Sequence, residues 1–240
     1  MYEERRYRGK MRPHDLICYE VQHKETDLFC CTKTDLSSFI QERVFLYRHQ
    51  LEEYIYMKPL FKETLGPLES DPVAPAIVRE MIETSALLNV GPMATVAGAV
   101  AEFVGKDIMS LSDSFIIENG GDIYLKTDVE RVIQLYAKDS PFSEKIGIKL
   151  KACDFPYGVC TSSATVGPSL SFGHADAVCI VAPSALFADG LATCLGNIVK
   201  KKDDIATAIE KGRKLPGVMG ILIVLGEHLG IWGDLDIVKI

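Results

Sequence analysis

The chain has 240 residues, 48% of them apolar and 25% charged, which predicts a packed globular core and argues against disorder. Its net charge of −7 argues against a nucleic-acid partner, because nucleic acids are bound by basic surfaces. No apolar signal-peptide segment follows the basic N-terminus, and the longest apolar stretches are interrupted by polar residues or too short to span a bilayer. We therefore expect a cytoplasmic protein with no membrane partner.

Periodicity and turn residues predict the elements of the first half of the chain. Two short strands precede a long helix that Pro59 ends, and the break at Gly91-Pro92 separates two further helices. The last of these helices carries a stripe of small residues, which predicts close packing against a sheet or a ligand. The strands are expected over 16–21, 28–32, 114–117 and 129–136, the helices over 35–57, 76–88 and 94–104, and the stripe at Ala94, Ala97, Gly98 and Ala101.

The second half repeats the order of two strands, helices and two strands. The strands are expected over 145–151, 177–181, 218–225 and 229–237, and the helices from Ser184 to about residue 200 and over 203–211. This order predicts an α+β fold with antiparallel sheets covered by helices. We expect one domain over 1–240 with two halves, a first unit over 1–138 and a second over 139–240. Exposed sheet edges make a homo-oligomer plausible.

The cysteine pattern fits neither a disulfide framework nor a zinc ribbon. The seven cysteines are odd in number, two are adjacent, and no C-x-x-C pair occurs. We therefore expect a reducing compartment with mostly buried thiols. Cys160 stands at the head of a hydroxyl-rich segment, where a thiol could be catalytic, and the alternative is an inert thiol at the edge of the core.

Asp189 and Thr193 are the candidate metal ligands. They stand four residues apart in a predicted helix, so their side chains share one face. A carboxylate and a hydroxyl are hard oxygen donors, which suit Mg²⁺ better than zinc. Two side chains do not complete an octahedron, and an ordinary acidic residue in the first turns of a helix is the alternative interpretation of Asp189.

Glycine-containing breaks supply candidate ligand contacts in the first half. Gly120 and Gly121 precede Asp122 and allow either a plain hairpin turn or a close approach of the backbone to a ligand. The Gly91-Pro92 break precedes a helix N-terminus, whose free N–H groups favour an anion, although most such breaks are structural.

Residues 157–197 combine a hydroxyl-rich, glycine-punctuated loop with a buried strand and a helix. Small residues let backbone N–H groups approach a ligand, so this stretch predicts a small-molecule site. His174 and Asp176 share the loop and could carry a proton, or simply satisfy loop backbone. The candidate hydroxyl groups of the loop belong to Thr161, Ser162 and Ser163.

These motifs occur in an order that resembles the ApbE superfamily. They are Asn-Val-Gly-Pro-Met-Ala over 89–94, Glu-Asn-Gly-Gly-Asp over 118–122, Cys-Thr-Ser-Ser over 160–163 and Ala-Asp-Gly-Leu-Ala-Thr over 188–193. The best-known members are flavin transferases, which use Mg²⁺ to move FMN from FAD onto a protein threonine or serine. Residues 1–240 as a whole are similar to a short branch of that superfamily. The resemblance implies a fold of two tandem T-fold-like units, each of the form β2α2β2.

The resemblance also implies roles for residues of this chain. Asp189 and Thr193 would bind Mg²⁺ together with the backbone carbonyl of Ala94. FAD, FMN or another nucleotide diphosphate would be the small-molecule ligand. Thr95 stands where the transferases carry a lysine, and Val100 stands where they carry an aspartate. The ligand-binding residues implied are Gly91, Pro92, Met93, Gly120, Gly121, Asp122, Thr161, Ser162 and Ser163, with His174 and Asp176 as proton carriers.

Three hypotheses of function follow. The first is an Mg²⁺-dependent protein that binds a flavin or other nucleotide diphosphate and transfers part of it. The second, a hint from the branch that the chain resembles, is a non-flavin role in sulfide assimilation into homocysteine, with Cys160 as the residue that handles sulfur. The third is a binding protein that has kept the fold without the chemistry.

Overall fold

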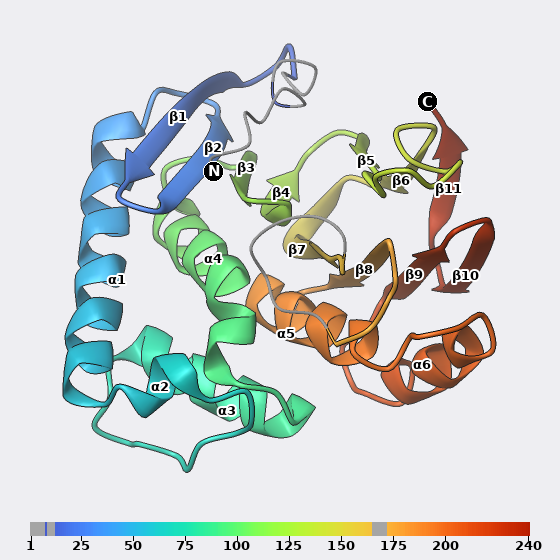
Figure 1. The fold of residues 1–240 in the computed structure, drawn as a ribbon. Helices are drawn as coiled ribbons and strands as arrows, with labels where there is room; N and C mark the ends of the chain where they lie inside the picture. Colours follow the sequence, from blue (N-terminus) through green and yellow to red (C-terminus); the bar gives the residue numbers. More distant parts are fainter. Residues whose placement is uncertain (1–7, 9–12, 165–171) are drawn as a thin grey trace.

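The computed structural model describes Arg8, residues 13–164 and residues 172–240. The centre of the described part is an antiparallel sheet of eight strands in the order β1-β2-β3-β4-β7-β8-β9-β10 (Figure 1). Pairing of β4 with β7 joins the two halves of the chain into this one sheet. The strands are β1 (Ile17–His23), β2 (Thr26–Thr32), β3 (Phe115–Asn119), β4 (Asp122–Thr127), β7 (Cys153–Ser162), β8 (Ala177–Ala182), β9 (Gly220–Leu225) and β10 (His228–Gly233).

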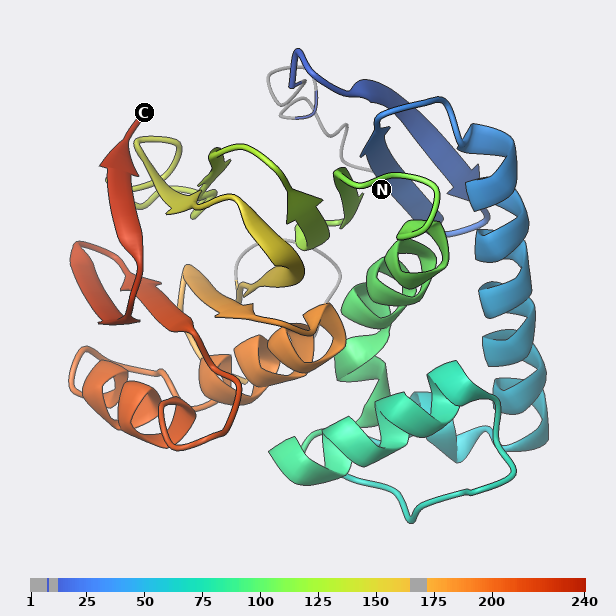
Figure 2. The ribbon, with the colours of Figure 1, turned by 180° about the vertical axis from the view of Figure 1, so that it is seen from behind.

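The helices cover one face of this sheet, and a small second sheet covers the other face of its second half (Figures 1 and 2). The small sheet has the order β11-β6-β5, with β5 (Arg131–Gln134), β6 (Ile146–Leu150) and β11 (Asp236–Lys239). The helices are α1 (Ser37–Met57), α2 (Leu60–Glu63), α3 (Ala76–Leu88), the 3-10 helix η2 (Pro92–Thr95), α4 (Val96–Ile108), α5 (Ala185–Gly196) and α6 (Asp204–Gly212).

The inner strand β8 shows how both faces of the main sheet are buried. All six of its residues are buried. Because successive side chains point to opposite faces, Val178 and Ile180 join the core under the helices, while Cys179 and Val181 join the core under the small sheet. A strand covered on both faces has no polar face, which explains its continuous apolar sequence.

The predicted α+β class is confirmed, and each half places two strands, then helices, then two strands in the main sheet. Two strand predictions were wrong in their placement. The segments predicted over 129–136 and 145–151 become β5 and β6 of the small sheet instead of strands of the repeated units. The segment predicted over 229–237 is divided between β10 and β11, because the chain turns at Gly233 with a φ of +98°.

The segment predicted as the start of a hydroxyl-rich loop is the strand β7, which pairs with β4 and with β8. Its small residues hide the alternation by which a strand is recognised. The structure explains why they are small: a Cβ added at Gly158 would lie 2.4 Å from the backbone nitrogen of Ala185, so α5 lies directly on this strand.

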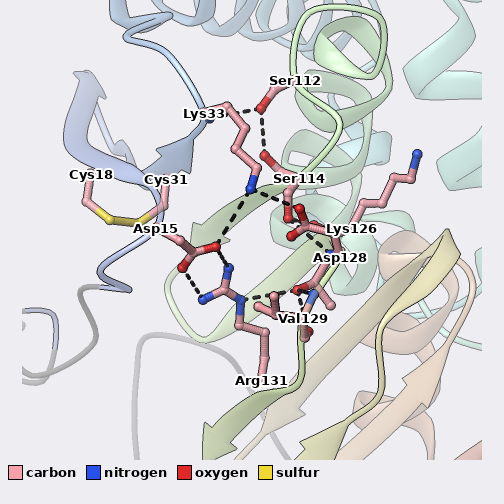
Figure 3. Close-up of polar contacts among 11 residues, drawn as sticks. Asp15, Cys18, Cys31, Lys33, Ser112, Ser114, Lys126, Asp128, Val129 and Arg131 are labelled. Atoms are coloured by element: carbon pink, nitrogen blue, oxygen red, sulfur yellow. Dashed lines mark hydrogen bonds and ion pairs between the residues drawn. A yellow bond between two sulfur atoms is a disulfide. The ribbon is translucent and has the colours of Figure 1, made fainter.

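The expectation of unpaired thiols was wrong for one pair. Cys18 and Cys31 face each other across β1 and β2, 4.1 Å apart at their Cα atoms, and form a disulfide. Cysteines directly opposite in an antiparallel pair can be bridged, and the sequence alone does not give that register. Figure 3 shows the disulfide beside an ion-pair cluster in which Asp15 binds Arg131 (2.7 Å from Nη1 to Oδ1) and Lys33 binds Asp128 (2.9 Å).

Among the described helices, no single one is long and apolar enough to cross a membrane. Helix α3 and the segment Pro92–Ile108 meet the length and composition test only as a pair, which is bent by 102°.

Glu102 joins α4 to the start of α5. Its buried carboxylate accepts hydrogen bonds from the Ser184 hydroxyl (2.7 Å) and the Leu186 N–H (2.9 Å), and it pairs with Lys106 (2.9 Å). We expect Glu102→Ala to lower the free energy of unfolding by about 2–3 kcal/mol, because buried donors lose a charged acceptor. Urea unfolding measures this loss.

The control is Glu80→Ala, which removes the other carboxylate that pairs with Lys106. Glu80 is exposed and 3.4 Å from the ammonium group, so its loss should cost less than about 0.5 kcal/mol. Equal losses in the two variants would contradict a special role for Glu102.

Candidate functional site

The structure brings the α5 candidate Asp189 against the first turn of α4. The Gly98 N–H donates to Asp189 Oδ2 over 2.9 Å. This contact needs a close crossing of the two helices, since a Cβ added at Gly98 would lie 2.3 Å from the Ala185 carbonyl oxygen. The small-residue stripe predicted on α4 therefore packs against a helix at this position.

Asp122 is the second carboxylate of the site. It begins β4, is buried, and its Oδ1 accepts a hydrogen bond from the Thr161 N–H over 3.3 Å. Burial and the negative charge of Asp189 raise the pKa of Asp122 well above its ordinary value. Burial raises the pKa of Asp189 to about 7, against the effect of the backbone hydrogen bonds from Gly98 and Ala97.

The two carboxylates therefore interact in a poorly solvated place. Among the described residues, no lysine, arginine or histidine forms an ion pair with Asp122 or Asp189. Buried charges of one sign are costly unless a counter-charge compensates them. The arrangement therefore suits a bound cation.

The β3–β4 turn lies next to this pair. Asn119 and Asp122 are paired residues, so Gly120 and Gly121 form a two-residue hairpin turn, with φ of +68° and +103°. Positive φ at both positions is what a type I′ turn requires. A Cβ added at Gly121 would meet no atom within 4 Å, so glycine is needed there for its backbone conformation.

Two side chains hold the turn in place. Asn119 Nδ2 donates to the Ala97 carbonyl on α4 (3.1 Å), and the Gly121 N–H donates to Glu118 Oε1 (2.8 Å). Sequence reasoning did not identify either contact. The first joins residues that only the tertiary fold brings together, and the second depends on the tight turn. In the sequence, only the paired glycines indicated a turn here.

The predicted hydroxyl residues lie at the end of β7. Thr161 and Ser162 are partly exposed and Ser163 is buried. The backbone of Thr161 reaches Asp122, so the hydroxyl segment and the β3–β4 turn belong to one neighbourhood. Residues 165–171, which complete the predicted loop, lie outside the described residues.

The Gly91–Ala94 motif consists of Gly91, which precedes η2, and the first three residues of that 3-10 helix. Gly91 and Pro92 are buried, and a Cβ added at Gly91 would lie 2.2 Å from the Thr64 carbonyl oxygen. Met93 and Ala94 are partly buried, and the Ala94 N–H donates to the Gly91 carbonyl (3.0 Å). This motif packs close to α5, because a Cβ added at Gly190 would lie 2.8 Å from Thr95.

His174 and Asp176 make their described contacts elsewhere. The backbone N–H of His174 donates to the Val199 carbonyl (2.7 Å). The residue is exposed, and its ring nitrogen Nδ1 lies 3.2 Å from the Lys200 carbonyl oxygen. Asp176 Oδ2 accepts from the Gly226 N–H (2.7 Å) in the β9–β10 turn. These contacts favour the interpretation in which both side chains satisfy loop backbone.

Cys160 is fully buried on β7, and its thiol donates to the Ala185 carbonyl over 3.3 Å. Burial, together with the negative charges of Asp122 and Asp189, raises the pKa of the Cys160 thiol well above its ordinary value. A protonated, inaccessible thiol is a poor nucleophile, so the geometry favours the inert alternative.

The acidic pair predicts a pH dependence of the metal-free protein. Asp189 ionises near 3.8 when unfolded and near 7 when folded, so between these values the folded state holds a proton that the unfolded state has lost. The Asp189 contribution to stability should therefore fall as the pH rises from about 4 to about 7. Melting temperatures of wild type and Asp189→Asn across this range measure the difference. A melting temperature of wild type that rises relative to that of Asp189→Asn as the pH rises would contradict a raised pKa of Asp189.

Comparison with known protein families identifies the family of this chain. A family model described as "AbpE bacteria" matches residues 9–227. The chain is a member of this ApbE-like family. Two similar relatives are named UPF0280 protein. The one from Methanococcus vannielii is 38% identical over 227 residues and covers 92% of each chain, and the one from Methanococcus aeolicus is 42% identical over 193 residues and covers 78% of each.

The fold is that of ApbE proteins. The apo form of the Pseudomonas stutzeri flavinyl transferase ApbE superposes with a TM-score of 0.60 at 12% identity, over 90% of this chain and 94% of that one. The ApbE protein of Thermotoga maritima gives a TM-score of 0.58 at 14% identity, over 91% and 97%. These likenesses confirm the predicted ApbE-like fold.

Proposed function

We propose that the chain binds a flavin or another nucleotide diphosphate together with a divalent cation, at a site built around Asp122 and Asp189. The observation that carries the proposal is the pair of interacting carboxylates, Asp122 buried and Asp189 partly buried, which has no cationic partner among the described residues. A cation would neutralise the pair, and an anionic ligand would in turn complete the coordination of the cation.

The donor set suits Mg²⁺. Asp189 and Thr193 stand one turn apart on α5, and Ala94 lies in the η2 segment that packs against the same helix. No group of three or more His, Cys, Asp or Glu side chains able to hold a metal occurs among the described residues, which argues against a zinc-type site. Mg²⁺ is commonly held by one or two carboxylates plus ligand phosphates and water. When bound, the ion would offset charge on the diphosphate.

The ligand would lie over the β3–β4 turn and the end of β7. The open space outside Gly121 leaves room for a ligand against the turn. Ser162 shares the helix-facing side of β7 with Cys160, so its hydroxyl is the candidate donor to phosphate oxygens. The Thr161 side chain alternates to the opposite face, and only its backbone N–H reaches Asp122. Asp122 would orient the backbone of Thr161 through its hydrogen bond and share the charge of the cation.

The flavin itself is supported by fold likeness. Two solved structures with this fold are described as flavin or flavinyl transferases, at 12% and 15% identity. Thr95 and Val100 are buried in this chain, and Thr95 donates to the Pro92 carbonyl over 2.8 Å. These positions would carry a lysine and an aspartate in the transferases, so ligand binding is the primary proposal and flavin transfer is a separate second step.

Calorimetric titration with FAD, FMN and ADP, with and without Mg²⁺, tests the proposal. FAD and ADP should bind only when Mg²⁺ is present, and FMN more weakly because it has one phosphate. Binding that does not depend on a divalent cation, or no binding of any of the three, would refute it. Adding a threonine-bearing acceptor protein tests transfer: AMP release with covalent flavin on the acceptor would establish it, and their absence with intact binding would leave a binding protein.

The sulfur-handling hypothesis requires a reactive Cys160 thiol, whereas the structure predicts an unreactive one. Iodoacetamide should modify the partly exposed Cys153 more than about tenfold faster than the buried Cys160 in the folded protein. Mass spectrometry of the native protein over time measures both rates. Preferential labelling of Cys160 would restore the sulfur hypothesis in place of the nucleotide one.

A further inference from the structure

Arg8 lies on the face of the main sheet that is opposite the helices. Its guanidinium is buried and stands over the ring of Phe29, 5.8 Å from the ring centroid. Phe29 and Glu118 are paired across β2 and β3, and they alternate with Cys30 and Ile117, which face the helices. Arg8 therefore contacts the face of β3 that is opposite the helices, and β3 leads into the β3–β4 turn.

The guanidinium makes a directional set of contacts there. Arg8 Nε donates to Glu118 Oε2 over 2.8 Å, and Nη2 is also 2.8 Å from the same oxygen. Nη1 donates to Asp27 Oδ1 over 2.8 Å, and Nη2 donates to the Asp27 carbonyl over 2.9 Å. Charged hydrogen bonds between buried groups with this geometry fix the orientation of the carboxylate.

The Glu118 carboxylate connects Arg8 to the β3–β4 turn. While Oε2 is held by Arg8, Oε1 accepts the N–H of Gly121 over 2.8 Å. Gly121 has a φ of +103° and stands immediately before Asp122. A rotation of the Glu118 carboxylate would release the N–H that holds the turn, and the position of Asp122 depends on that turn.

We infer that Arg8 is a positioning residue of the ligand site, which holds the Gly120–Gly121 turn in its binding conformation through the carboxylate of Glu118. The inference rests on the proposed function for the identity of the ligand. The link from Arg8 to Gly121 rests on the geometry alone. Arg8 touches neither Asp122 nor Asp189 among the described contacts, so its effect on binding is indirect.

Arg8→Gln tests this link with a readout that general destabilisation does not produce. In the folded variant, the amide resonance of Gly121 should shift and its hydrogen exchange should accelerate, and the affinity for ADP with Mg²⁺ should fall roughly 5- to 10-fold. Arg48→Gln is the matched control, since Arg48 makes a comparable set of contacts with Thr26, Glu25 and Glu52. It should leave both readouts at wild-type values.

Asp27→Asn separates positioning from charge compensation. It weakens the Asp27 contact of Arg8 and leaves the Glu118 contact, so Gly121 should keep its wild-type resonance. An unchanged Gly121 amide in folded Arg8→Gln would overturn the inference, as would equal shifts in Arg48→Gln. If Arg8→Gln does not fold, Arg8→Lys decides: a Gly121 amide resonance displaced from its wild-type position supports the inference, and an unchanged one overturns it.

The two proposals fail separately. A wild-type protein that binds no nucleotide would refute the proposed function, while the Gly121 amide of the free protein would still report whether Arg8 holds the turn. Nucleotide binding that is intact in a variant whose Gly121 amide has shifted would overturn the positioning role alone.

Discussion

Asp189→Asn is expected to reduce the affinity for ADP with Mg²⁺ at least about 100-fold, because a carboxylate ligand of a hard cation is replaced by a weakly coordinating amide. The amide oxygen can still accept the Gly98 N–H, so the crossing of α4 and α5 should persist. The substitution also removes the negative charge of partly buried Asp189 beside buried Asp122. The metal-free variant should therefore melt at or above the wild-type temperature at pH 8.

This combination of lost binding and retained stability distinguishes a ligand residue from a structural one. The control is Asp107→Asn on α4, whose carboxylate accepts the Tyr47 hydroxyl over 2.6 Å. It should leave cation-dependent binding at the wild-type level. An Asp189→Asn protein that binds ADP with Mg²⁺ as tightly as wild type would remove Asp189 from the site.

Gly98→Ala is expected to lower the free energy of unfolding by about 3 kcal/mol and to weaken ligand binding as well. The new Cβ would lie 2.3 Å from the Ala185 carbonyl oxygen and 2.8 Å from Asp189 Cβ. A backbone oxygen cannot swing aside as a flexible side chain can, so α4 and α5 must separate. Separation lengthens the hydrogen bond from Gly98 to Asp189. Chemical denaturation and calorimetry measure the two effects.

Gly66→Ala is the matched control for this variant. Its Cβ would approach Thr64 Oγ1 no closer than 4.0 Å, so the change should alter stability by less than about 1 kcal/mol. Equal stabilities of Gly98→Ala and wild type would show that the helices do not cross as closely as described. A stable Gly98→Ala protein with normal binding would separate the crossing from the site.

The sequence predicted the helices better than the strands. The long helix predicted over 35–57 is α1 (Ser37–Met57), and the one predicted over 76–88 is α3 (Ala76–Leu88). Helix periodicity and proline breaks are local signals. Strand β7 was not predicted because Gly158 and its neighbours are small. They are small because α5 lies directly on this strand, and a local sequence pattern does not reveal that contact.

The candidate site shows the same division. Asp189 could be singled out because its helical spacing to Thr193 is local, and the glycine pair before Asp122 is a local turn signal. The contact of Asp189 with Gly98 spans 91 residues, and that of Arg8 with Glu118 spans 110. Contacts of that kind follow from sheet register and helix crossing, so they appear only in the folded chain.

Locating the cation tests the account most directly. Crystals grown with ADP and Mn²⁺ in place of Mg²⁺ allow the metal to be found by anomalous scattering. We predict one peak within about 2.5 Å of an Asp189 carboxylate oxygen, with the diphosphate beside the Gly120–Gly121 turn. A peak at a distant surface carboxylate, or nucleotide bound away from this turn without metal, would contradict the account.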